Sequence, residues 1–322
     1  MELLTGIARN PIPGGGMAGM FAGYDGTPLR YCIWNETRGP KRGTVCVFTG
    51  RTEFIEKYLE VVTDLRRRGF TVAIMDWRGQ GGSARALKDP RKGYVKSFDE
   101  YDRDLVRFMK DVVLPDCLPP FYALAHSMGG NILLRNATRK GLWFDRIVLT
   151  APMIRLERET MPYPFGISKA VTEVACAVGL GRNYIPGGRR KEVWDDVPFE
   201  GNDLTSDKER YERNKAIVRA APELDLGAPT FAWFRAAARS INMISAPDYP
   251  EKVGVPVLLF GAQNDREVST RAIEDFALKL KVGSHVIIPN ARHEILQERD
   301  ELRQLFRATF DAYIMGDERD VA

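Results

Sequence analysis

One short segment, AHSMGG from Ala125 to Gly130, constrains this chain more than any other. It follows the apolar run FYAL at 121–124 and precedes the helix-like run NILLRNATRK. A serine held in a tight turn between a buried strand and a helix requires nearly side-chain-free residues two positions before and after it, here Ala125 and Gly129. Alanine in place of the usual glycine adds one methyl group and is expected to fit. The segment therefore predicts a sharp turn that exposes Ser127 as a nucleophile.

A serine hydroxyl is a weak nucleophile until a base removes its proton, and the chain contains three histidines. His293 lies on a predicted loop between a strand-like run and a long helical pattern from Ile295 to Ile314, where an imidazole can reach the turn. It is the predicted base. His126 is the alternative, but it adjoins Ser127 and is expected to point to the other side of the turn. His285 begins a strand-like run and is expected to be structural.

An acid that orients the histidine is expected between serine and histidine in chain order. The segment GAQND follows the buried strand predicted at 256–260, which places Asp265 in a loop at the end of that strand. Its carboxylate is expected to hold the imidazole in the correct tautomer and to stabilise the imidazolium. Asp76 also follows a predicted strand, but the glycines of DWRGQGGS indicate a turn in which Asp76 is structural.

Attack on a carbonyl builds negative charge on oxygen, so two backbone N–H donors must already face that oxygen. One is predicted at Met128, directly after the nucleophile. The other is predicted at Arg51, in the loop TGRTEFIEKY that follows the strand predicted at 44–48. The alternative for this loop is an ordinary turn with a solvated arginine.

Several segments together resemble a known family. They are GRTEFIEKY, DWRGQGGS, SFDEYDRDL, LAHSMGG, APM, GAQND and RHEIL. The combination is similar to the serine hydrolases grouped as lysophospholipases and monoacylglycerol lipases, which are related to the serine aminopeptidase-like α/β-hydrolases. The resemblance extends over nearly the whole chain after about Gly23. It implies an ester hydrolase with a triad of Ser127, Asp265 and His293.

One departure bears on the substrate. The loop before the first predicted helix begins with His-Gly in monoacylglycerol lipases, whereas this chain has Thr49-Gly50-Arg51-Thr52-Glu53. That form is closer to the bacterial lysophospholipase branch of the family.

The order of predicted elements gives the fold class and the domains. Short β-branched runs at 29–34, 44–48, 71–75, 121–125 and 146–150 alternate with helical patterns. The alternation resumes at Val255, which predicts a mostly parallel sheet flanked by helices. The interval between these parts is expected to be an inserted, mainly helical cap, with helical runs at 167–180 and 231–241. The sequence thus predicts an α/β-hydrolase fold with core segments at 1–154 and 241–322 and a cap at 155–240.

The cap is expected to select the substrate, because the core supplies generic acyl-transfer chemistry. Within its helical run FAWFRAAARSI, Trp233 and Phe234 are predicted to line the cleft above Ser127 and to bind an acyl chain. The alternative is that these aromatic residues form the core of the cap itself.

Composition limits the cofactors and partners. The cysteines at 32, 46, 117 and 176 have no metal-binding spacing, so neither a metal nor a cofactor is predicted. Despite the net charge of +4, the arginines at 66–68 are expected to be solvated, and no nucleic-acid partner is predicted. The N-terminus does not resemble a secretory signal, and no apolar run approaches the ~18 residues of a membrane span. A cytoplasmic location with peripheral contact to membrane lipid is expected, and oligomeric state is not predicted.

The sequence therefore favours a carboxylic ester hydrolase that cleaves a lysophospholipid or a monoacylglycerol through an acyl-enzyme. A peptidase or a thioesterase is the nearest enzymatic alternative. An epoxide hydrolase or dehalogenase is disfavoured, because those enzymes use aspartate where this chain has Ser127. A non-catalytic ligand-binding protein is disfavoured because all three triad positions are filled.

Overall fold

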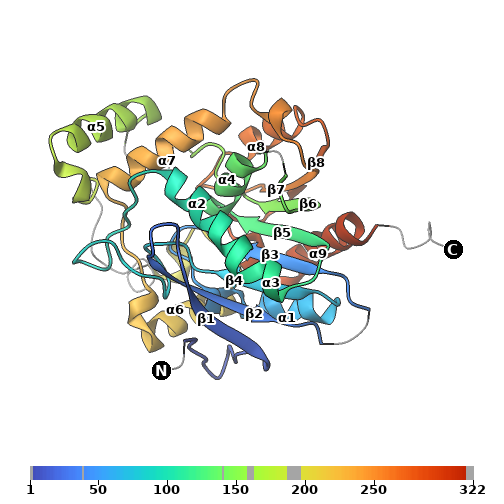
Figure 1. Ribbon diagram of the computed structural model, residues 1–322. Helices are drawn as coiled ribbons and strands as arrows, with labels where there is room; N and C mark the ends of the chain where they lie inside the picture. The colour runs from blue at the N-terminus through green and yellow to red at the C-terminus, as the bar shows by residue number, and fades with distance from the viewer. Residues whose placement is uncertain (1–2, 38–39, 140, 158–162, 187–196, 317–322) are drawn as a thin grey trace.

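The computed structural model describes residues 3–37, 40–139, 141–157, 163–186 and 197–316, and within them eight strands form one sheet (Figure 1). The strand order is β1-β2-β4-β3-β5-β6-β7-β8. β1 pairs with β2, and β2 with β4, in antiparallel fashion, whereas the pairs from β4 to β8 are parallel. The strands are β1 (Gly16–Ala22), β2 (Pro28–Trp34), β3 (Thr44–Phe48), β4 (Thr71–Met75), β5 (Phe121–His126), β6 (Arg146–Thr150), β7 (Val257–Ala262) and β8 (Gly283–Ile288).

Both faces of the sheet are buried, because alternate side chains of each central strand enter different cores. In β3, Cys46 and Phe48 belong to one buried cluster, and Val45 and Val47 belong to the other. A strand buried on both sides must be apolar throughout, which is why the sequence of β3 is TVCVF.

Helices cover the two faces in separate groups (Figure 1). Those that contribute to the first cluster are α2 (Phe98–Phe108), α4 (Met128–Asn136), α7 (Phe231–Ile244) and α8 (Thr270–Ala277). Those that contribute to the second are α1 (Leu59–Arg67) and α9 (Asp300–Met315). The described part of the chain contains no helix that is both long and apolar enough to cross a membrane.

The predicted fold class is confirmed, and the strands expected at 44–48, 71–75 and 146–150 have those bounds in the structure. One helix prediction was wrong at its start. The pattern from Ile295 to Ile314 is not one helix, because a 3₁₀ turn (Ile295–Gln297) precedes α9 and Glu298 has an extended backbone between them. The carboxylate of Glu298 accepts hydrogen bonds from the amides of Arg292 and Ser206, at 2.8 and 3.1 Å, which holds this break in place.

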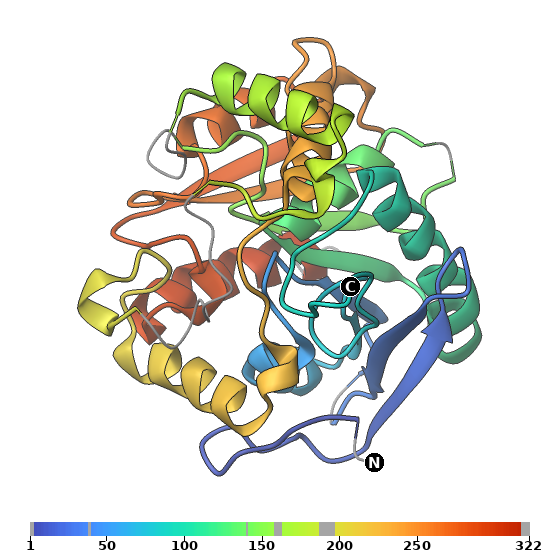
Figure 2. The same ribbon diagram turned by 90° about the vertical axis from the view of Figure 1, so that its left-hand side faces the viewer.

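Between β6 and β7 the described residues form three α-helices, which lie beside the ends of the parallel strands (Figure 2). They are α5 (Phe165–Ala177), α6 (Lys208–Ala220) and α7. The sequence indicated α5 and α7 but not α6. Helix α7 continues through residue 240 to Ile244 and contributes Trp233 and Ile241 to the first core cluster. The division into core and cap at 154 and 240 stays a prediction.

Candidate active site

Ser127 occupies the turn between β5 and α4 and has a backbone that non-glycine residues rarely adopt. Its φ is 49° and its ψ is −112°. The turn is held by the Ser127 amide, which donates to the carbonyl of Thr150 on β6 at 3.0 Å. A Cβ atom at Gly129 would lie 2.5 Å from the carbonyl oxygen of Phe48, so the small residue expected at this position is required by close backbone approach. The hydroxyl of Ser127 is thereby presented, half-buried, at the carboxyl edge of the sheet.

His293 and Asp265 reach the same edge from neighbouring strands. Asp265 follows β7, and His293 follows β8. The Nε2 atom of His293 lies 3.1 Å from Oγ of Ser127, and its Nδ1 atom lies 2.8 Å from Oδ2 of Asp265. The other carboxylate oxygen of Asp265 accepts the amides of Glu267 and Val268 at 2.8 and 3.0 Å. The structure therefore brings together the three side chains that the sequence singled out, in one hydrogen-bonded line.

The carboxylates near His293 favour the protonated form of its imidazole. Burial of His293 opposes its charge, but the Asp265 carboxylate, with smaller contributions from Glu267 and Glu294, raises the pKa of His293 to about 9. Burial also opposes the charge of Asp265, but His293 and the two amide donors lower the pKa of that carboxyl. Such an arrangement stabilises the imidazolium that forms when a serine is deprotonated.

The other two histidines have different surroundings. The Nδ1 atom of His126 lies 3.0 Å from the carbonyl oxygen of Thr150, and its ring centroid is 4.7 Å from that of His293. Burial lowers the pKa of His126 to about 4, so the ring is neutral and packs behind the predicted base. His285 lies in the edge strand β8, 4.0 Å from Glu274, away from the serine turn.

Asp76 is structural, as the glycine-rich turn indicated. One of its carboxylate oxygens accepts Nε of Arg30 at 2.7 Å and the Gly82 amide at 2.8 Å. The other accepts the Ile55 amide at 3.0 Å. Both oxygens are thus engaged in holding β2, β4 and the start of the 55–58 helical turn together.

The loop after β3 lies beside the start of α4, since a Cβ atom at Gly129 would also lie 2.7 Å from the Thr49 carbonyl oxygen. Trp77 donates from Nε1 to the Thr49 carbonyl at 2.9 Å, which fixes the beginning of the loop. The Gly50 amide donates to Glu53 at 2.5 Å and so faces away from the serine turn. Within the described residues, the amides of Arg51 and Met128 have no acceptor. Two unused donors at this position suit an oxyanion, and their assignment stays a prediction.

A buried ionic cluster lies below this loop, and no sequence pattern indicated it. The Nζ atom of Lys57 lies 2.8 Å from Glu53 and 2.5 Å from Glu294, and the side chain of Lys57 is fully buried. The second oxygen of Glu53 accepts the Tyr58 hydroxyl at 2.6 Å in addition to the Gly50 amide. Glu294 directly follows the predicted base. Lys57 therefore links the loop after β3 to the loop after β8.

The two aromatic residues predicted to bind substrate have different neighbours. Trp233 packs edge to face on Phe98, donates from Nε1 to the Tyr101 hydroxyl at 3.3 Å and lies under the guanidinium of Arg51. Phe234 instead contributes to a small apolar pocket between α5 and α7. Trp233 is thus part of the packed core next to the site, whereas Phe234 faces the helix above it.

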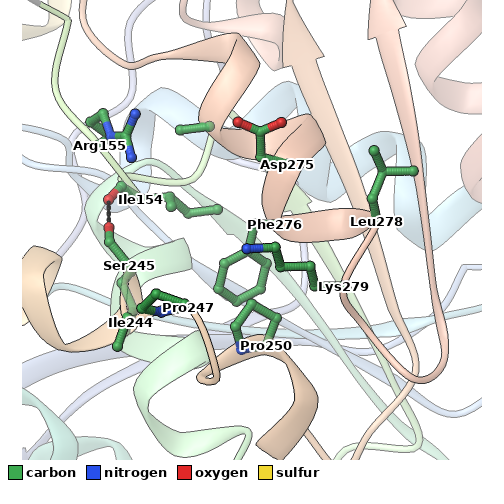
Figure 3. A pocket seen from close by; sticks show the side chains of 12 residues that line it. Ile154, Arg155, Ile244, Ser245, Pro247, Pro250, Asp275, Phe276, Leu278 and Lys279 are labelled. Atoms are coloured by element: carbon green, nitrogen blue, oxygen red, sulfur yellow. Dashed lines mark hydrogen bonds between the residues drawn. The ribbon is translucent and has the colours of Figure 1, made fainter.

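Two larger pockets lie outside the serine turn. Figure 3 shows one of about 400 Å³ between the end of α7 and α8, lined by Asp275 of α8 and by Lys279, which follows that helix. The Ser245 hydroxyl there donates to the Ile154 carbonyl at 2.8 Å. None of the predicted site residues lines it. The other, of about 540 Å³, is polar and includes Asp265 and Arg292.

The fold and the serine, histidine and aspartate side chains on three strand-end loops define the class of protein. It is an α/β-hydrolase of the serine hydrolase type. A family model described as serine aminopeptidase, S33, matches residues 39–300, and the chain belongs to this family.

Relatives and solved structures agree with that assignment. The chain is 33% identical over 293 residues to lysophospholipase L2 of Escherichia coli strain K12, covering 88% of this chain and 83% of the relative. It is 27% identical over 263 residues to a probable lysophospholipase L2 of Haemophilus influenzae, covering 82% and 80%. The fold is similar to that of a soluble variant of monoglyceride lipase from Saccharomyces cerevisiae, with a TM-score of 0.72, 18% identity and coverage of 98% of each chain.

Proposed function

We propose that this serine hydrolase cleaves the carboxylic ester of a single-chain lipid, with a lysophospholipid favoured over a monoacylglycerol. The observation that carries the proposal is the line from Ser127 through His293 to Asp265, with distances of 3.1 and 2.8 Å. The relatives that are lysophospholipases support the lipid substrate. The domain division and a cytoplasmic location stay predictions from the sequence.

In the proposed reaction, Oγ of Ser127 attacks the ester carbonyl carbon and its proton passes to Nε2 of His293. Asp265 stabilises the imidazolium, and the amides of Arg51 and Met128 bind the oxygen that becomes negatively charged. Collapse of the tetrahedral intermediate breaks the bond to the alcohol, which takes the proton from His293. Water then attacks the acyl-serine with the same base, which releases the fatty acid and restores Ser127.

Peripheral contact with lipid is part of the proposal and rests on helix α5. Four apolar residues spaced for one helix face are exposed on α5 and at its C-cap: Ile167, Val171, Val174 and, at the cap, Val178, with exposed fractions of 52, 44, 64 and 66%. Water-exposed apolar residues in such a stripe are expected to insert at a lipid surface. The pocket that Phe234 shares with α5 is then the proposed entry for the acyl chain.

A panel of substrates tests the reaction. Lysophospholipids, monoacylglycerols, nitrophenyl esters, acyl-CoA thioesters and aminoacyl amides are compared with the wild type and Ser127→Ala. We expect hydrolysis of the lipid esters and of the nitrophenyl esters, covalent labelling of the wild type by a fluorophosphonate, and loss of both in the variant. Preference for the amide or the thioester would replace the proposal by a peptidase or a thioesterase. Equal labelling of Ser127→Ala would remove Ser127 from the reaction.

Co-sedimentation with phosphatidylglycerol vesicles tests the lipid contact. The double variant Val174→Glu/Val178→Glu is expected to remain in the supernatant instead of sedimenting with the vesicles, because it places two charges on the exposed face of α5 and its C-cap. Leu278→Glu is the matched control, since Leu278 is 75% exposed and lies at the end of α8. Equal binding of wild type and both variants would contradict the contact.

A further inference from the structure

The guanidinium of Arg51 is a cation inside the protein that uses little of its hydrogen-bonding capacity. One terminal nitrogen donates to the Gly227 carbonyl at 2.5 Å. Among the described residues, the buried Nε atom has no hydrogen-bond partner and no carboxylate forms an ion pair with this group. A guanidinium offers five N–H donors, so most of them have no acceptor within the described part of the chain.

The buried Arg30 is compensated by acids, and Arg51 differs from it. Arg30 contacts Glu56 at 2.7 Å and Asp76 at 2.6 Å, and these two carboxylates raise its pKa despite burial. Burial instead lowers the pKa of Arg51 to about 10. The group is still charged at neutral pH, but the charge is not balanced by the surrounding protein.

Two carboxyl groups, Glu267 and Asp225, act on Arg51 from a distance. Burial raises the pKa of Glu267, which reduces its tendency to carry charge. Asp225 lies 3.8 Å from a terminal nitrogen of Arg91, a second cation. An anion that entered the site would therefore meet an incompletely balanced guanidinium.

Trp233 holds this guanidinium in place. The CZ atom of Arg51 lies 5.0 Å from the centroid of the Trp233 ring, which is a cation–π contact. The ring is itself fixed by its hydrogen bond to Tyr101 and its packing on Phe98. Trp233 contacts the flat face of the guanidinium. The N–H donors point outward from the edge of that group, where they can bind two oxygens of a phosphate.

The covalent geometry links this group to the reaction. The amide nitrogen and the guanidinium carbon of an arginine are separated by a fixed number of covalent bonds. The ester carbonyl carbon and the phosphorus of a 1-acyl lysophospholipid are separated by the same number. We propose that Arg51 recognises both ends of this unit, with its amide at the ester oxygen and its guanidinium on the phosphate of the substrate's glycerophosphate group. This assignment rests on the proposed function and names its specificity-determining side chain.

A pair of short-chain substrates tests the assignment. A monoacylglycerol and the same acylglycerol with a 3-phosphate, both below their micellar concentrations, are compared by kcat/KM. Arg51→Met keeps the backbone amide and removes the charge. It is expected to lower kcat/KM for the phosphate substrate on the order of 10- to 100-fold more than for the neutral one, as expected for a charged hydrogen bond. Arg51→Lys should retain part of the preference, because it keeps a charge without the planar fork.

Arg85→Met is the matched control. Arg85 is another buried arginine whose guanidinium donates to the same segment, at the carbonyls of Glu223 and Asp225, at 2.8 and 3.3 Å. Removal of the Arg85 guanidinium should change kcat/KM for the two substrates by the same factor.

Three outcomes would overturn the assignment of the phosphate site. Equal losses on the two substrates in Arg51→Met would show that Arg51 acts only by holding the Gly227 segment. Inhibition of the neutral substrate by inorganic phosphate through Arg51, with no advantage for the phosphate substrate, would assign the group to a free anion. Equal rates of the wild type on both substrates would also exclude it. If the wild type hydrolysed neither substrate, the proposed function itself would fail.

Discussion

Replacement of Lys57 by methionine tests whether the buried ionic cluster joins the two loops of the site. Lys57 is fully buried between Glu53 at 2.8 Å and Glu294 at 2.5 Å. Methionine fills a similar volume but leaves two buried carboxylates without their cation. Breaking a buried ion pair by removing one partner costs about 3–5 kcal/mol, and we expect Lys57→Met to lower the free energy of unfolding by that amount. We also expect kcat to fall more than KM rises, because Glu53 holds the Gly50 amide of the oxyanion loop.

The decrease in the free energy of unfolding caused by Lys57→Met should depend on pH in a defined direction. In the wild type, burial opposes the charge of Glu53, but Lys57 outweighs it and holds the pKa of Glu53 well below its usual range. That contribution is present above the unfolded pKa and is lost as pH falls. Burial already raises the pKa of Glu294 in the wild type, where Lys57 partly offsets it. In the variant Lys57 no longer offsets burial at either carboxyl, so both pKa values are higher than in the wild type and a proton stabilises the folded variant at low pH. The difference between wild type and variant should therefore be larger at about pH 8 than at about pH 5.

Urea unfolding at the two pH values measures the effect, with two comparison proteins. Lys252→Met removes an exposed ion pair of 2.6 Å to Asp248 and should lower the free energy of unfolding far less than Lys57→Met does, because solvent screens an exposed pair. Lys57→Met/Glu294→Gln removes one of the two uncompensated charges and should recover part of the loss. A Lys57→Met protein that is as stable as Lys252→Met at both pH values, with unchanged kcat, would refute the reasoning.

Two further predictions concern the serine turn and its base. Because Asp265 raises the pKa of His293 to about 9, and only neutral imidazole accepts a proton, kcat/KM should rise with pH from neutral toward about 9. Asp265→Asn should shift this rise to lower pH and reduce kcat on the order of 10⁴-fold, and a profile that is flat above pH ~6 in the wild type would contradict this account. Gly129→Ala places a Cβ atom 2.5 Å from the Phe48 carbonyl and should cost about 1–3 kcal/mol in thermal unfolding, whereas Ala125→Gly should cost no more than about 1 kcal/mol. Equal melting temperatures for the two turn variants would show that the turn is less tight than its geometry indicates.

The central strands could be predicted because burial on both faces leaves a continuous apolar run with turn residues at each end. The segments at 44–48, 71–75 and 146–150 are of this kind. Strand β1 could not be predicted in the same way. It is an edge strand that contains two glycines and the exposed residues Met17 and Met20, a composition that does not indicate a strand. Its hydrogen bonds to β2 are what hold it in the sheet.

Helix α6 was not predicted because it has no apolar stripe of the usual width. Its sequence KERYERNKAIVRA is strongly polar, and much of what holds it is ionic. Arg210 contacts Glu60 of α1 at 2.7 Å and Asp300 of α9 at 2.8 Å, so partners far away in the chain decide its position.

The side chains of the line from Ser127 to Asp265 could be singled out from sequence because the chemistry limits both residue type and chain order. The cluster around Lys57 could not. Glu53 and Lys57 have the spacing of an ordinary surface ion pair on a helix, and Glu294 lies 237 residues after Lys57. Nothing in their spacing shows that they meet in the interior. Within the described residues the Arg51 guanidinium forms no ion pair. This too follows from how the loops pack and could not be read from the segment GRTEFIEKY.

The order of strands in the sheet also determines when activity can arise during synthesis. Among the described residues, β7 and β8 are the last strands in chain order and extend the parallel sheet outward beyond β6. A growing chain that ends before β7 already contains the serine turn, but it lacks both Asp265 and His293. If these two residues activate the serine as predicted, Ser127 is an ordinary alcohol at that stage. We therefore expect the nascent protein to attack esters only after β7 and β8 have been added to the edge of the sheet.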